Sequence, residues 1–120
     1  MKVAGGVFLD EDAPSAPQNA AFRTFLLKVH ARCNLACTYC YVYAMDDRGW
    51  ERKPVRMAPD VVDLAAERIA AHARCHELSS IDVVFHGGEP LLLGASTLVA
   101  YRNRIAERLK GVVEVRFGLQ

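Results

Sequence analysis

The feature that most limits the folds open to this chain is an alternation of apolar strand patterns with helix patterns. Residues 22–30 alternate and then become solidly apolar, which fits a buried strand, and 81–85 and 112–119 predict a second and a third strand. Helix patterns begin at Pro59 and cover 96–110. A β–α–β–α–β order implies an α/β fold with a parallel sheet, right-handed crossovers and helices packed against the sheet.

Both helices have recognisable ends and one apolar face. Pro59 suits a first helical position, Asp60 lies beside the positive end of the helix dipole, and Gly111 is placed to end the second helix. The apolar positions of the first helix are Val61, Leu64, Ala65, Ile69 and Ala73, and those of the second are Leu98, Tyr101, Ile105 and Leu109.

The composition is that of a small folded protein. The 120 residues are 52% hydrophobic and 24% charged, enough for one domain with a modest core. We expect residues 1–20 to be a flexible leader with one short strand at 7–9, and 21–120 to form the domain. A net charge of +1 argues against nucleic acid or membrane partners, and the first residues do not resemble a secretory signal, so the expected compartment is the cytoplasm.

Three of the four cysteines, Cys33, Cys37 and Cys40, fall within eight residues. In a reducing compartment such a cluster indicates metal binding rather than disulfides. Thiolates are the ligands of iron–sulfur clusters, and three of them can hold three irons of a [4Fe–4S] cluster while leaving the fourth iron open. The alternative is a zinc site with His30 or His86 as the fourth ligand. The chain lacks the second cysteine pair typical of zinc sites, which favours the cluster.

A glycine turn, Gly87 and Gly88, follows the second predicted strand just as the cysteines follow the first. Carboxyl ends of parallel strands share one edge of a sheet, and ligands bind at that edge in α/β barrels and open sheets. We therefore expect the cysteines and the glycine turn to meet at one site.

The pattern C-x3-C-x2-C, with Tyr39 before its last cysteine, resembles the signature of the radical S-adenosylmethionine (SAM) superfamily. The resemblance implies a [4Fe–4S] cluster whose open iron is chelated by the amino and carboxylate groups of SAM. Reduction then cleaves the sulfonium to a 5′-deoxyadenosyl radical that takes a hydrogen atom from the substrate. It also implies that Tyr39 lies near the adenine, although packing of Tyr39 behind the loop stays equally open.

The run Gly87-Gly88-Glu89-Pro90 resembles the motif that holds the methionine end of SAM in this superfamily. Two glycines let the main chain approach a ligand closely, Glu89 can satisfy the ligand's ammonium, and Pro90 stiffens the exit. We assign no side chain a catalytic role.

Four further features have simpler interpretations. We expect His86 to be a hydrogen-bonded histidine at a strand end and Cys75 to be a small core residue. The charged stretch 46–56 predicts a solvated loop, in which Trp50 is either an exposed aromatic or the anchor of a lid.

The resemblance extends over roughly 22–120, and the stretch CNLACTYCYVY at 33–43 is most similar to peptide maturases with a SPASM domain. Among these maturases the likeness is greatest to the cyclophane-forming ones, and anaerobic sulfatase-maturating enzymes resemble the chain too. This implies a precursor peptide or protein as substrate and an electron donor such as a flavodoxin or ferredoxin. Family members continue with further β/α units, so we expect a truncated, N-terminal portion of a partial (β/α) barrel with its third strand as an unpaired edge.

Overall fold

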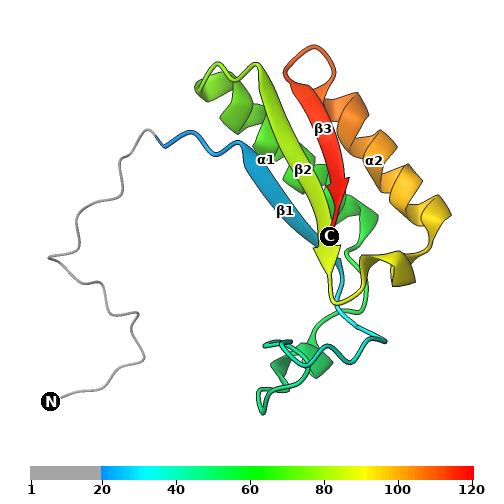
Figure 1. Cartoon of the computed structure of the whole chain (residues 1–120). Helices are drawn as coiled ribbons and strands as arrows, with labels where there is room; N and C mark the ends of the chain where they lie inside the picture. Colours follow the sequence, from blue (N-terminus) through cyan, green and yellow to red (C-terminus); the bar gives the residue numbers. More distant parts are fainter. Residues whose placement is uncertain (1–19) are drawn as a thin grey trace, which may run out of the picture.

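The computed structural model describes residues 20–120, and their strands form one parallel sheet in the order β1-β2-β3 (Figure 1). The predicted leader and its short strand at 7–9 lie outside the described residues. Helix α1 connects β1 to β2, and α2 connects β2 to β3, so the predicted α/β fold and element order are confirmed. The elements are β1 (Thr24–His30), η1 (Gly49–Arg52), α1 (Pro59–Cys75), β2 (Ser80–Gly87), η2 (Pro90–Leu93), α2 (Ala95–Leu109) and β3 (Glu114–Leu119).

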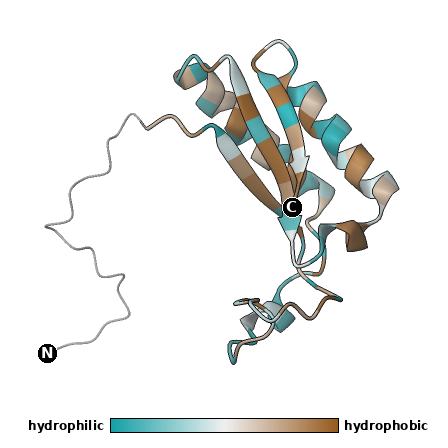
Figure 2. Ribbon diagram, viewed as in Figure 1, coloured by the Kyte–Doolittle hydropathy of each residue, from teal (hydrophilic) through white to brown (hydrophobic). Residues whose placement is uncertain are grey.

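The core lies between one face of the sheet and the two helices. Side chains alternate across a strand, and in β2 this buries Ile81, Val83 and Phe85 while Asp82 and Val84 on the opposite face are half-buried. Brown, the colour of hydrophobic residues, is prominent along the strands in Figure 2, and the buried residues of both helices belong to the same core as those of the strands. β3 pairs only with β2 among the described strands, as predicted for an edge.

The predicted apolar face of α1 was partly wrong. Val61 and Leu64 are 46% and 48% exposed, and the buried face begins one position later, at Val62. Residues four apart advance about 40° beyond a full turn at each step, so a strict period of four drifts around the helix. The buried residues follow the true helical period instead: Val62, Ala66, Ile69, Ala70 and Ala73.

Cys75 is exposed, and the prediction that it belongs to the core was wrong. It follows the buried Ala73 by two positions, which places its side chain roughly 200° further around α1 and away from the sheet.

The apolar face predicted for α2 is confirmed, because all four of its residues are buried. The helix ends at Leu109, and Gly111 adopts a φ of +74°, which is the left-handed conformation that glycine tolerates best.

A short strap, residues 55–57, lies antiparallel to the end of β1. The Ala31 amide donates to the Val55 carbonyl at 2.8 Å, and the Met57 amide donates to the Val29 carbonyl at 2.9 Å. The Tyr101 hydroxyl of α2 donates to the Met57 carbonyl. The strap therefore ties the chain that follows the cysteine loop (residues 33–43) to both the sheet and α2.

Asp63 of α1 joins the two helices by accepting from Arg104 at 2.8 Å and pairing with Arg108 at 2.9 Å. The hydrogen bond from Arg104 is the main reason that the pKa of Asp63 lies below its usual value. A carboxyl pKa that folding lowers stabilises the fold above the unfolded-state pKa, and that stabilisation is lost as the pH falls through the folded-state pKa.

We therefore expect Asp63→Asn to lower the thermal midpoint modestly at neutral pH. The difference from wild type should shrink in acid, as followed by circular dichroism melts across pH. Glu107→Gln, which removes a carboxylate that forms no ion pair within residues 20–120, is the matched control. A deficit of Asp63→Asn that persists unchanged in acid would contradict the assignment.

No helix within the described residues is long and apolar enough to span a bilayer.

Candidate functional site

The cysteine loop and the glycine turn meet at the carboxyl end of the sheet, at the bottom of Figure 1. His30, the last residue of β1, pairs with Gly87 at the end of β2. The Gly88 amide donates to the His30 carbonyl at 3.1 Å, and the Glu89 amide donates to the Arg32 carbonyl at 3.0 Å. The two predicted motifs therefore lie side by side.

Both glycines of the turn are required by this close approach rather than by an unusual φ. A Cβ atom on Gly87 would lie 2.4 Å from the His30 carbonyl oxygen. A Cβ on Gly88 would lie 2.4 Å from the Arg32 carbonyl oxygen and 2.8 Å from Cβ of Cys33. Only glycine lets the turn pack against the start of the cysteine loop.

The three loop cysteines and the two glycines line one cavity of about 200 Å³. Tyr39, 85% exposed, stands at this cavity and is not packed behind the loop. The remaining lining residues are Leu35, Tyr41, Val42, Tyr43 and His86, which the sequence had not singled out together as a set.

Backbone amides surround two of the thiols. The Leu35 amide donates to Sγ of Cys33, and the Tyr43 amide donates to Sγ of Cys40, each at 3.4 Å. The Tyr43 amide, followed by that of Val42, lowers the pKa of the Cys40 thiol. Amide donors favour the thiolate, the form that binds metals.

The donor set of the cavity is three thiols, the ligand type of iron–sulfur clusters, in which each thiolate binds a different iron. Within residues 20–120, no three His, Cys, Asp or Glu side chains are grouped closely enough to hold one metal ion as the loop stands. His30, one of the two candidates for a zinc ligand, is buried with Nδ1 3.3 Å from the Arg32 amide, and it does not line the cavity.

Glu89 and Pro90 lie next to the cavity without lining it. The Glu89 carboxylate accepts from the Leu91 amide at 2.9 Å and so caps η2, and Pro90 is buried at the start of that helix. This local cap occupies one oxygen of the carboxylate predicted to meet the ligand's ammonium.

His86 faces the cavity, which differs from its predicted hydrogen-bonded role. Its half-buried side chain forms no hydrogen bond within the described part of the chain, and it lines the cavity together with the cysteines. In β2 the buried, odd-numbered side chains face the helices. The side chain of His86 therefore lies on the opposite face of the sheet.

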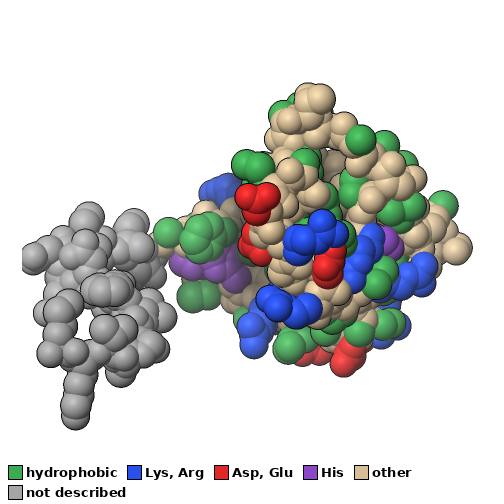
Figure 3. Space-filling model, turned by 90° about the horizontal axis from the view of Figure 1, so that it is seen from below, with side chains coloured by type: hydrophobic (Ala, Val, Ile, Leu, Met, Phe, Trp, Pro, Cys, Tyr) green, Lys and Arg blue, Asp and Glu red, His purple; other side chains and the backbone are tan. Residues whose placement is uncertain are grey.

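The predicted loop 46–56 is largely exposed, but Trp50 within it is half-buried. The Trp50 ring lies edge-on to Tyr43 with centroids 5.0 Å apart. Trp50 is therefore an anchor for the cysteine loop. Seen from this end, the surface mixes hydrophobic side chains with Lys and Arg (Figure 3).

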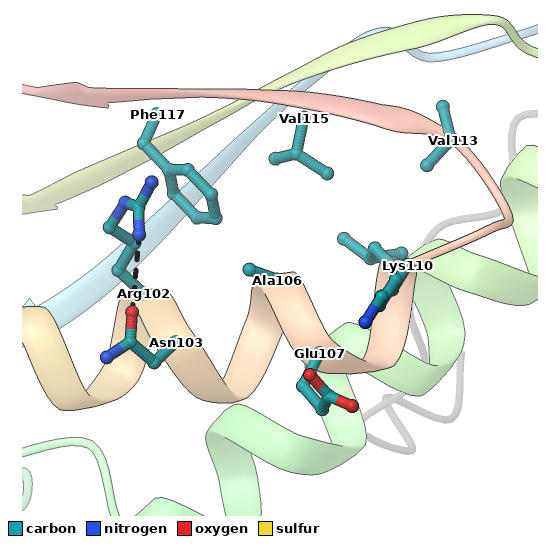
Figure 4. Close-up of a pocket in the computed structure, with 9 residues that line it drawn as sticks. Arg102, Asn103, Ala106, Glu107, Lys110, Val113, Val115 and Phe117 are labelled. Carbon is teal, nitrogen blue, oxygen red and sulfur yellow. Dashed lines mark hydrogen bonds between the residues drawn. The ribbon is translucent and has the colours of Figure 1, made fainter.

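A second hollow, of about 440 Å³, lies between α2 and β3 (Figure 4). Val115 and Phe117 of β3 point into it, and the Arg102 guanidinium lies 5.3 Å from the centre of the Phe117 ring. Its lining contains no cysteine or histidine, so it offers no ligands for the chemistry of the first cavity.

The parallel α/β fold and the two motifs that line one cavity agree with the resemblance to radical SAM proteins, and so does a comparison with family models. The model of the Radical SAM superfamily matches residues 27–119, more than three quarters of the chain, including all three loop cysteines and the glycine turn. The chain belongs to the radical SAM superfamily. A search among curated proteins found no match.

Proposed function

We propose that this chain holds a [4Fe–4S] cluster through Cys33, Cys37 and Cys40 and binds SAM beside it at Gly87 and Gly88. The observation that carries the proposal is that these five residues, brought from two loops, line a single cavity. Membership of a superfamily of SAM-dependent radical enzymes supports the same assignment.

Held by Cys33, Cys37 and Cys40 and reduced from outside, a cluster would supply one electron to the SAM sulfonium, which would release methionine and a 5′-deoxyadenosyl radical. The residues of this chain prepare the site for it. Amides from the cysteine loop favour thiolate at Cys40. Gly87 and Gly88 keep the β2 turn free of side chains and in contact with the start of the loop, so main-chain groups can lie against the methionine end of SAM.

The aromatic side chains of the loop would cover the nucleoside end. Tyr39 and Tyr41 are 85% and 80% exposed and both line the cavity. Aromatic rings offer a flat apolar surface to an adenine. Their exposure leaves both rings free to close on a ligand.

We further propose that the substrate is a peptide or protein, modified as in SPASM-type maturases, and that a flavodoxin or ferredoxin supplies electrons. The resemblance of 33–43 supports the substrate class. A groove of about 430 Å³ beside the loop, mainly apolar and bordered by Lys28, Lys53 and Arg56, also suits an extended chain with acidic residues.

Anaerobic reconstitution with iron and sulfide tests the proposal. We expect about four irons per chain and the brown colour of a thiolate-ligated cluster. Addition of SAM should then change the electron paramagnetic resonance (EPR) signal of the dithionite-reduced protein. A colourless protein that takes up zinc in preference to iron, or a reconstituted protein that ignores SAM, would contradict it.

A further inference from the structure

The side chain of Arg32, directly before the first loop cysteine, binds four backbone carbonyls. Its Nη1 donates to the carbonyls of Ala31 at 2.7 Å and Trp50 at 2.9 Å. Its Nη2 donates to the carbonyls of Glu51 at 3.1 Å and Lys53 at 3.2 Å. Three of these carbonyls lie 18 to 21 residues further along the chain.

Three of these carbonyls, those of Trp50, Glu51 and Lys53, belong to the end of η1 and the residue after it. The Trp50 carbonyl also accepts from the Lys53 amide at 3.1 Å, and carbonyls at the end of a helix in general need donors from outside the helix. A guanidinium presents several N–H groups in one rigid plane, so it can satisfy more than one carbonyl at once. Arg32 therefore fixes η1 against the start of the cysteine loop.

The Trp50 ring of η1 contacts both ends of the loop. The Arg32 guanidinium lies 5.3 Å from the ring centre at one end, and the Tyr43 ring lies edge-on at 5.0 Å at the other. The Tyr43 amide is also the donor to Sγ of Cys40. The Trp50 Nε1 is buried and has no hydrogen-bond partner within the described residues, so stacking and packing hold the ring in place.

We propose that Arg32 and Trp50 are positioning residues that close the stretch 33–43 into a loop with a fixed base. We call this pair the Arg32–Trp50 clasp. Most side chains of the loop are exposed, and one backbone hydrogen bond, from the Cys40 amide to the Cys37 carbonyl, lies inside it. The clasp therefore supplies order that the loop itself lacks, and it lowers the entropy lost when three thiolates bind one cluster.

The part of this inference that concerns the cluster rests on the proposed function, and the part that concerns the loop does not. Two readouts separate them. Trp50 is the only tryptophan of the chain, so the intrinsic fluorescence of the metal-free protein reports on the clasp alone. Iron release from the reconstituted protein to a chelator reports on the cluster.

Arg32→Met is the test variant and Arg48→Met its control. Arg48 lies over the same ring at 5.8 Å and pairs with Glu51, but it donates to no backbone carbonyl within residues 20–120. We expect Arg32→Met to raise acrylamide quenching of Trp50 about twofold and to speed iron release roughly tenfold. It should also broaden the EPR signal of the reduced cluster, while the circular dichroism melt stays that of wild type. Arg48→Met should match wild type in every readout.

Arg32→Lys tests the same geometry without loss of charge. A lysine ammonium reaches fewer carbonyls than the guanidinium plane, so we expect quenching and iron release between those of wild type and Arg32→Met. Unchanged iron release and unchanged quenching in Arg32→Met would overturn the proposal, and so would equal effects of Arg48→Met. If wild type takes up no iron, the proposed function fails, and the quenching result still decides whether Arg32 holds the loop.

Discussion

Cys37→Ala is expected to take up no stable cluster on anaerobic reconstitution, while Cys75→Ala loads iron as wild type does. Cys37 lines the cavity with the other two loop cysteines, whereas Cys75 is exposed at the end of α1. A cubane left with two protein ligands lacks the thiolate that its third iron requires. Iron and sulfide analysis, with the visible absorbance, measures the difference.

Cys75→Ala is the matched control because it also removes one thiol from the 120-residue chain. Circular dichroism melts of both variants should match wild type, since neither side chain belongs to the core. Equal losses of iron from the two variants would refute the ligand assignment.

Gly88→Ala is expected to have the second largest effect. The new Cβ would overlap the Arg32 carbonyl oxygen at 2.4 Å, and that oxygen cannot move away freely because it accepts from the Glu89 amide. The overlap must be relieved by separating the glycine turn from the cysteine loop. We expect a loss of about 1–3 kcal/mol in the free energy of unfolding, together with weaker cluster retention.

Gly118→Ala is the control for that substitution. A Cβ on Gly118 would lie 3.4 Å from Cγ2 of Val84, which is an ordinary contact, and the site is in β3 away from the cavity. Chemical denaturation and iron retention should be close to wild type for Gly118→Ala and lower for Gly88→Ala. If both variants behave alike, the close approach of the glycine turn to the cysteine loop is not the reason that position 88 requires glycine.

The order of the elements and the meeting of the two motifs could be predicted because each depends on local patterns. The run 81–85 has apolar residues at four of its five positions, which indicated a strand. Parallel strands bring their carboxyl ends together whatever the loop lengths. The buried face of α2 could be predicted equally well, because its residues follow the helical period: Leu98, Tyr101, Ile105 and Leu109.

The errors arose where the hydrophobic pattern was ambiguous or where the residues in contact are far apart in the sequence. In α1, alanines lie on several sides, and the period of four that starts at Val61 runs beside the buried face, which starts at Val62. Three of the carbonyl partners of Arg32 lie in and directly after η1, a short helix that was not predicted, and no spacing rule connects an arginine to backbone atoms 18 to 21 residues further along the chain. The cap that Glu89 provides to η2 was hidden because that short helix was itself not predicted.

The strap at 55–57 lies at the boundary between the core of the sheet and helices and the cysteine loop, two regions that differ in their hydrogen bonding. On one side lie the core strands and helices, whose amides are paired in regular ladders. On the other side lies the cysteine loop, largely exposed and sparsely hydrogen-bonded. Val55 bonds to Ala31, directly after β1, and Met57 bonds to Val29 within it. Because these bonds belong to the strap and not to the loop, we expect the loop to open and re-form locally while the core stays folded. Local opening of the cysteine loop would therefore leave the sheet intact.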